Sequence, residues 1–212
     1  MSTRLHAIAQ ALRTVFVQPA VFLGQTTFAA GRRAGRGLLQ ARGQLLMLGV
    51  AGGLGPGVQV GDVVVASELL QHDLDASPIF PRHQIPGRGL SRIPTCPTLS
   101  NALFAAARQT LAVSGGQQVH EGLIVSGDRF VSSAAEAQAL QAELPDALAV
   151  EMEGAAIAQV CLDFGLPFGV VRSISDRADD TAHVDFTRFV REVASPHALA
   201  IVQAALAHLP AA

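Results

Sequence analysis

The spacing of hydrophobic positions changes repeatedly along the chain, and it predicts strands that alternate with helices. Short, continuously apolar runs predict buried strands at 45–50, 61–66, 121–127, 147–152 and 168–174. Apolar residues at helical spacing predict helices at 99–113, 133–144, 154–164 and 186–209. The last helix is expected to be interrupted near Ser195-Pro196, because proline lacks the amide hydrogen that an inner helical turn requires.

Strands that alternate with helices are typical of α/β proteins, and continuously apolar strands favour a sheet covered on both faces. We therefore expect a single-domain αβα sandwich with a mixed central sheet over residues 1–212. The stretch between Gln71 and Pro97 loses the pattern and predicts a long surface loop. The glycine-rich stretch 51–57 predicts a tight loop directly after the first strand.

Composition narrows the classes of function. The formal net charge is −2 and half of the 212 residues are hydrophobic, which indicates a globular protein with a small neutral ligand rather than a nucleic-acid or membrane-surface binder. No uncharged run is long enough to predict a membrane span or a leader segment. The two cysteines, Cys96 and Cys161, indicate a reducing cytoplasm, and the seven histidines lack metal-ligand spacing, so we expect no metal and no cofactor.

Acidic residues follow two of the predicted strands and are the first candidates for chemistry. Glu151 and Glu153 would share one face if the backbone stayed extended, and Asp176 follows the strand after them. Both strands and the glycine stretch are expected to end at the same carboxyl edge of the sheet, where open sheets bind ligands. The alternatives are structural: Glu153 complements the positive end of a helix, and Asp176 caps the next segment or pairs with Arg172.

Apolar side chains lie close in sequence to these acids. Phe130, Val131, Met152 and Phe186 would pack against a planar base, although each is equally compatible with a place in the core. The glycine stretch lacks the Rossmann spacing and the lysine of a phosphate-binding loop. Phosphate groups of a dinucleotide are therefore not its expected target.

Five motifs together resemble the nucleoside phosphorylase superfamily, and most closely the bacterial 5′-methylthioadenosine/S-adenosylhomocysteine nucleosidases. The resemblance extends from about Leu45 to the end of the chain. The motifs are Gly49-Val50-Ala51-Gly52-Gly53-Leu54 with Val60-Gly61-Asp62-Val63-Val64-Val65, His72-Asp73-x-Asp75, Gly122-Leu123-Ile124-Val125-Ser126-Gly127-Asp128-x-Phe130, Val150-Glu151-Met152-Glu153-Gly154-Ala155-Ala156, and Arg172-Ser173-Ile174-Ser175-Asp176-x-Ala178-Asp179.

The resemblance implies hydrolysis of an adenine nucleoside at its N-glycosidic bond. Asp176 would protonate or hydrogen-bond purine N7, and Glu153 would bind the ribose hydroxyls and favour the cationic transition state. It also implies a homodimer in which the loop after His72 brings Phe80 or Ile79 into the partner's site. The remaining implied substrate-binding residues are Val50, Ala51, Gly52, Phe130, Val131, Met152, Arg172, Ser175 and Phe186.

The N-terminal part departs from this family pattern. Members normally begin with a strand that ends in glutamates, one of which positions the attacking water, whereas no Asp or Glu precedes Asp62 here. We expect a strand and much of a helix in the N-terminal part to be missing. We also expect hydrolysis to be weak or absent, because general-base assistance is worth roughly 100-fold to 10,000-fold. The alternatives are a phosphate-dependent phosphorylase that uses some of Arg32, Arg33, Arg36 and Arg42, or an adenosine-binding protein without catalysis.

Overall fold

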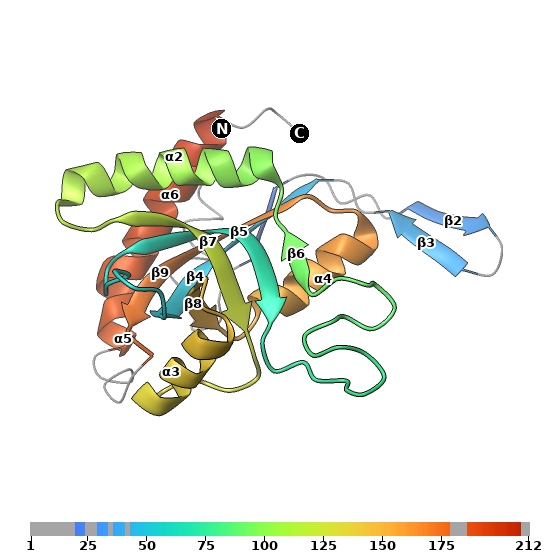
Figure 1. The fold of residues 1–212 in the computed structure, drawn as a ribbon. Helices are drawn as coiled ribbons and strands as arrows, with labels where there is room; N and C mark the ends of the chain where they lie inside the picture. The colour runs from blue at the N-terminus through green and yellow to red at the C-terminus, as the bar shows by residue number, and fades with distance from the viewer. Residues whose placement is uncertain (1–19, 24–28, 34–35, 41–42, 179–185, 209–212) are drawn as a thin grey trace.

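The structure is a computed structural model that describes residues 20–23, 29–33, 36–40, 43–178 and 186–208 (Figure 1). Strands and helices alternate over most of this length. In chain order the elements are β1 Ala20–Leu23, β2 Ala29–Arg33, β3 Arg36–Gln40, β4 Gln44–Gly53, β5 Val63–Gln71, β6 Arg92–Pro94, α2 Pro97–Ser114, β7 Val119–Ser126, α3 Ala134–Glu143, β8 Ala147–Glu151, α4 Gly154–Phe164, β9 Phe168–Asp176, α5 Phe186–Phe189, the π-helical turn η1 Val190–Ala194, and α6 Ser195–His208.

The main sheet is mixed, and its central strands pair in a closed circuit. Its order is β1-β4-β8-β7-β5-β6, and β9 closes the circuit because it pairs with both β4 and β5. β4 and β9 are parallel to each other, whereas β5, β7 and β8 run in the opposite direction. The β2–β3 hairpin forms a separate two-stranded sheet that extends away from the main sheet (Figure 1).

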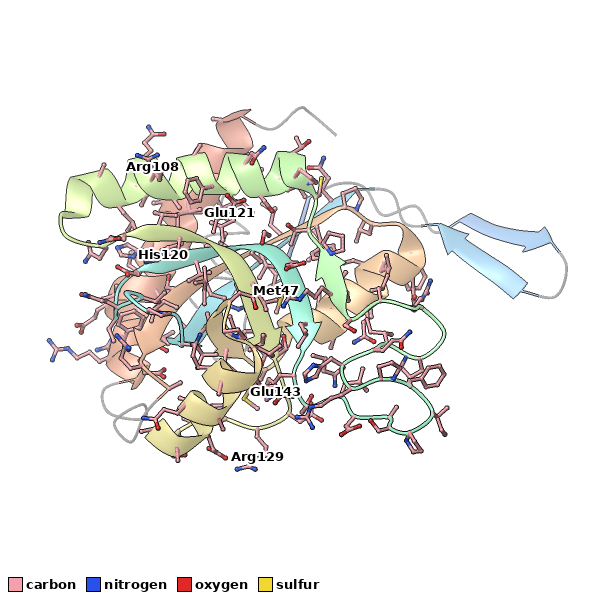
Figure 2. All side chains as sticks on the ribbon, viewed as in Figure 1. Met47, Arg108, His120, Glu121, Arg129 and Glu143 are labelled. Atoms are coloured by element: carbon pink, nitrogen blue, oxygen red, sulfur yellow. The ribbon has the colours of Figure 1, made fainter. Side chains whose placement is uncertain are left out.

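Alternate residues of the inner strands enter different apolar layers, as the period of two in a strand requires. In β4, Leu46 and Leu48 pack with α2 and α6, whereas Leu45 and Met47 belong to the layer that contains buried residues of α4. Figure 2 shows Met47 within the sheet, while exposed Arg108 of α2 lies at the outside. Both faces are therefore covered by helices, which confirms the predicted α/β architecture with a mixed central sheet.

Helix ends follow the signals in the sequence. The Ser133 hydroxyl accepts a hydrogen bond from the Glu136 amide at the start of α3, and Gly165 adopts the left-handed conformation that ends α4. The predicted interruption of the last helix is confirmed, since the π-helical turn η1 ends immediately before Ser195. Among the described residues, no helix combines the length and the apolar character needed to cross a membrane.

Two expectations about loops need correction. The glycine loop was placed directly after residue 50, but β4 continues through Gly53 because its pairing with β9 extends to Asp176. The long loop also contains a strand, β6, whose Ile93 is buried where it pairs with Leu69 of β5. A three-residue strand is too short to produce a recognisable period. The expected loss of an N-terminal strand and helix concerns the chain before about Gln44, of which residues 1–19, 24–28, 34–35 and 41–42 lie outside the described residues.

Candidate nucleoside site

Gly52, at the end of β4, is the point where the predicted site residues come together. Gly52 pairs with Asp176 of β9 on one side and with Val150 of β8 on the other. Strands in a sheet lie about 4.8 Å apart, so Asp176 and Val150 are separated by roughly 10 Å. Glu151 and the first turn of α4 follow Val150 directly.

This convergence does not have the origin that the sequence suggested. We expected β4, β8 and β9 to end at one carboxyl edge, but β8 runs antiparallel to β4 and therefore opposite to β9. The ends meet because β8 overlaps only the last two residues of β4, Gly52 and Gly53. The prediction of a shared edge was wrong, because periodicity carries no information about strand direction.

Gly52 lets Asp176 approach the backbone of β4 closely. A Cβ atom at position 52 would lie 2.9 Å from Ala178 Cβ and 3.0 Å from Asp176 Oδ1, closer than side chains normally pack. The Asp176 carboxylate is buried, accepting hydrogen bonds from the Ser175 hydroxyl at 2.6 Å and the Ala178 amide at 2.8 Å. Each carboxylate oxygen can accept more than one hydrogen bond, so further acceptor capacity remains.

The bond to the Ala178 amide matches the capping alternative for Asp176, but the suggested Arg172–Asp176 pair does not form. Arg172 instead pairs with Glu151, and both side chains are buried completely or almost so. Arg172 Nε lies 3.1 Å from Glu151 Oε2, and Arg172 Nη2 contacts the same oxygen and also Met47 Sδ at 3.2 Å. β8 and β9 do not pair with each other, so this ion pair connects two strands that backbone hydrogen bonds leave unconnected.

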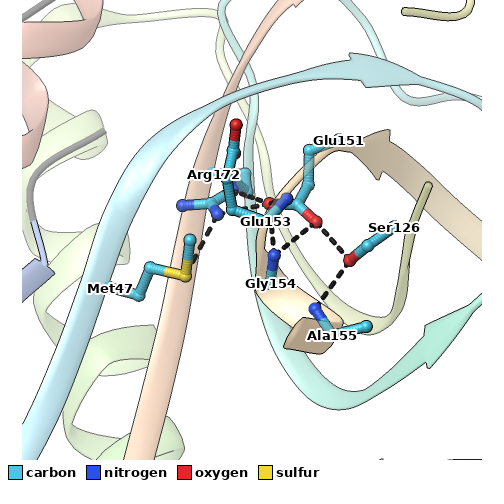
Figure 3. A network of polar contacts seen from close by, with 7 residues as sticks. All are labelled: Met47, Ser126, Glu151, Glu153, Gly154, Ala155 and Arg172. Carbon is cyan, nitrogen blue, oxygen red and sulfur yellow. Dashed lines mark hydrogen bonds and ion pairs between the residues drawn. The ribbon is translucent and has the colours of Figure 1, made fainter. Parts of the chain in front are cut away.

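Glu151 also holds the start of α4 (Figure 3). The Gly154 amide donates to Oε1 at 2.9 Å and to Oε2 at 3.0 Å, and the Ser126 hydroxyl donates to Oε1. Ser126 Oγ in turn accepts from the Ala155 amide at 2.8 Å. Burial by itself would raise the pKa of Glu151, but the Arg172 charge and these hydrogen bonds outweigh it, and the pKa is lowered.

Glu153 occupies the N-cap position of α4 without capping the helix by its side chain. The strand ends at Glu151, so the expectation that Glu151 and Glu153 share one extended face does not apply. Glu153 Oε2 is buried and has no hydrogen-bond partner among the described residues, and the same is true of Arg172 Nη1. Burial, and then the negative charge of Glu151, raise the pKa of Glu153.

The apolar candidates divide between surface and core. Phe130 is 47% exposed and Met152 is 40% exposed, so both are available to a ligand. Val131 instead packs against the core cluster that contains Leu54 and Ala178. Phe80 is half-buried, whereas the neighbouring Ile79 is 80% exposed.

The other candidates lie around β4 and β9. Ala51 and Gly52 are buried, while Val50 and Ser175 are half-buried. The side chain of Phe186, the first residue of α5, lies outside the described part of the chain. A cavity of about 350 Å³ opens on the α3 side of β4, lined by Gly53, Leu54, Ala134, Ala137, Gln138, Gln141 and Arg177. In the part of the chain that the structure describes, no group of three or more His, Cys, Asp or Glu residues is suited to a metal ion.

Ser126 is a functional candidate that the sequence alone did not single out, and the contacts of Glu151 were not predicted. Glu151 was considered only together with Glu153, and Ser126 was named only as part of a longer motif. The available signal was the pairing of two predicted strands, since Ser126 and Glu151 are opposite each other where β7 and β8 end in parallel.

The model of the phosphorylase superfamily matches residues 36–207, which include the whole arrangement around Gly52. The chain belongs to the phosphorylase superfamily. It is 38% identical over 155 residues to a 5′-methylthioadenosine/S-adenosylhomocysteine nucleosidase of Geobacillus thermodenitrificans. That match covers 73% of this chain and 63% of the relative, so the matched part spans less than two thirds of the relative's length.

Solved structures of superfamily members show the same fold. The nucleosidase of Neisseria meningitidis in complex with methylthio-immucillin-A has a TM-score of 0.70 and 28% identity, covering 99% of this chain and 96% of that one. An S-adenosylhomocysteine nucleosidase of Streptococcus pyogenes in complex with 5-methylthiotubericidin has a TM-score of 0.68 and 35% identity, covering 78% and 67%. The family resemblance predicted from the motifs is confirmed.

Proposed function

We propose that this chain binds 5′-methylthioadenosine and S-adenosylhomocysteine and hydrolyses their N-glycosidic bond to release adenine. The observation that carries the proposal is the double pairing of Gly52, which sets Asp176 about two strand spacings from the strand that leads to Glu153. We propose that the nucleoside lies between the strand ends that carry these two acids. The names of the superfamily relatives support this choice of substrates.

Asp176 is assigned to the purine and Glu153 to the sugar. In the reaction the C1′–N9 bond breaks, the oxygen of water joins C1′, and a proton reaches the departing base. Asp176 would donate a hydrogen bond or proton to purine N7, which neutralises the leaving group. Glu153, when ionised, would stabilise the cationic character of the sugar more in the transition state than in the ground state.

Two unpaired buried atoms support a sugar subsite beside α4. Glu153 Oε2 is an acceptor and Arg172 Nη1 a donor, and neither has a partner among the described residues. A hydroxyl group can donate to the first and accept from the second. Exposed Phe130 and Met152 supply apolar surface for the base and the sugar. Val50, Ala51, Gly52, Val131, Ser175 and Phe186 complete the proposed lining.

We further propose a cytoplasmic homodimer in which the loop after His72 contributes Phe80 to the partner's site. The 80% exposure of Ile79, beside Phe80, supports a contact with another chain at this loop. The loop is fastened to the fold by Arg82, whose Nε lies 2.5 Å from Glu143 Oε1 on α3. The loop is therefore held in place and presents its apolar tip outward.

The experiment is to incubate the protein with 5′-methylthioadenosine and to follow adenine, with and without inorganic phosphate. We expect adenine and a free thio-sugar, at a low rate because no acid lies among residues 1–61 to activate water. Phosphate-dependent formation of a sugar 1-phosphate would identify a phosphorylase instead. The backbone of Arg32, Arg33 and Arg36 lies in the separate β2–β3 hairpin, which argues against that alternative, and Arg42 lies outside the described residues.

Asp176→Asn tests the assignment of the acid. The variant keeps the size of the side chain and an acceptor oxygen, but it cannot provide the proton, so we expect adenine release to fall by roughly 100-fold or more. Binding of 5′-methylthioadenosine, measured by calorimetry, should persist. Unchanged turnover in this variant would contradict the role of Asp176, and absence of binding in the unaltered protein would contradict the proposed function.

A further inference from the structure

Glu151 contacts three separate parts of the fold through one carboxylate. It meets Ser126 at the end of β7, Arg172 on β9, and the Gly154 amide in the first turn of α4. Its side chain is only 1% exposed. Glu151 therefore cannot line an open site, and any effect on a ligand must pass through the groups that it holds.

Those groups include the residues assigned to the sugar. Glu153 lies two residues after Glu151, and its amide lies 3.3 Å from Glu151 Oε2. Glu151 also binds two of the three guanidinium nitrogens of Arg172, and the third, Nη1, has no partner within the described part of the chain. One buried side chain thus contacts both the Glu153 backbone and the Arg172 guanidinium group (Figure 3).

We propose that Glu151 is a positioning residue, which fixes Glu153 and Arg172 by clamping the first turn of α4 and the guanidinium group of Arg172, on β9, to the ends of β7 and β8. The inference rests on the proposed function, because it concerns the sugar side of the same site. Ser126 completes the clamp, since its hydroxyl joins Glu151 to the Ala155 amide.

The clamp has an electrostatic consequence that mere packing would lack. Among the described residues, the charged groups that act on Glu153 are Glu151 on β8 and Arg172 on β9. Glu151 raises the pKa of Glu153, while Arg172 lowers it. Replacing Glu151 by glutamine removes the negative neighbour and retains the positive one, so the midpoint of Glu153 titration is expected to move to lower pH.

The test compares the titration of Glu153 in the unaltered protein and in Glu151→Gln. Carboxyl-¹³C glutamate and NMR give the midpoint, and the signal is assigned by its loss in Glu153→Gln. We expect a lower midpoint in Glu151→Gln, together with an affinity for 5′-methylthioadenosine that is weaker by roughly 10-fold to 100-fold. Leu103→Ala, which opens a space in the α2 layer, is the control for lost stability, and its Glu153 midpoint should stay unchanged.

An unchanged midpoint in folded Glu151→Gln would overturn the proposal. Should Glu151→Gln fail to fold, Ser126→Ala is tested instead. It removes the hydroxyl that joins Glu151 to the Ala155 amide and keeps the buried Arg172–Glu151 ion pair. Ser126→Ala should weaken the affinity by roughly 10-fold, and unchanged affinity would also overturn the proposal. The titration needs no ligand, so a protein that shows the expected shift but does not bind 5′-methylthioadenosine would refute only the proposed function.

Discussion

The close approach of Asp176 to β4 predicts that Gly52→Ala disables the site. The added Cβ would lie 2.9 Å from Ala178 Cβ, whereas carbon atoms in contact are normally about 3.5–4.0 Å apart. The same atom would lie 3.0 Å from Asp176 Oδ1. Gly52 does not have a positive φ, so alanine fits the backbone and the effect comes from crowding alone.

The expected magnitude follows from this overlap of about 0.6–1 Å. Overpacking of this kind usually costs about 1–3 kcal/mol of folding free energy, which a domain of this size tolerates. The displacement falls on the segment that carries Asp176 and Ala178, and a misplacement of about 1 Å can reduce a rate by roughly 100-fold. Gly52→Ala should therefore fold, and it should lose most of its adenine release.

The assay measures adenine release from 5′-methylthioadenosine beside the free energy of unfolding in urea. Gly169→Ala is the matched control, because its Cβ would lie 2.7 Å from Leu103 Cδ1 near the start of β9, away from Asp176. Both variants should lose folding free energy. Only Gly52→Ala should also lose more adenine release than its loss of stability explains. Equal rates in the two variants would refute the reasoning that contact with β4 places Asp176.

Three further outcomes are expected. Arg172→Met should destabilise the fold by about 3–5 kcal/mol in urea unfolding, because it leaves the Glu151 carboxylate buried without its partner; a loss below about 1 kcal/mol would contradict a structural ion pair. Because the pKa of Glu153 is raised in the folded state, Glu153 stabilises the fold at pH values below the ordinary glutamate pKa. This contribution is lost as the pH rises through the pKa of the folded state. Glu153→Gln should thus be more stable than the unaltered protein at pH 7, with a gain that shrinks toward about pH 4; a gain that does not depend on pH would refute the shift. Phe130→Ala should weaken calorimetric binding of 5′-methylthioadenosine by about 10-fold without loss of stability, since the ring is 47% exposed, and unchanged affinity would remove Phe130 from the site.

Periodicity and end signals predicted much of the fold because they are local properties of the chain. Continuously apolar strands such as β4 and β9 require helices on both faces, and the structure has them. Ser133 and Gly165 mark helix ends through contacts within one turn. The short β6 was missed, since its formation depends on pairing with β5 rather than on its own pattern.

The site was harder to predict because its geometry depends on strand direction and on where β8 ends. Asp176 and Gly52 were selected as candidates from the sequence, and the structure pairs them, but the antiparallel overlap that joins β8 to β4 has no local signature. The different surroundings of Glu151 and Glu153 also escaped prediction, because a strand two residues longer would have put both on one face. Their roles in binding and catalysis stay predictions until the variants are measured.

The start of α4 depends on the Glu151 side chain and not on the Glu153 side chain, so position 153 can be substituted without loss of the helix. Glu151 and Ser126 satisfy the first amides of α4, so the helix does not rely on the Glu153 side chain for its start. Libraries at this one codon could therefore explore altered sugar preference with little risk of losing the scaffold. Substitutions of Glu151, by contrast, would destabilise the fold.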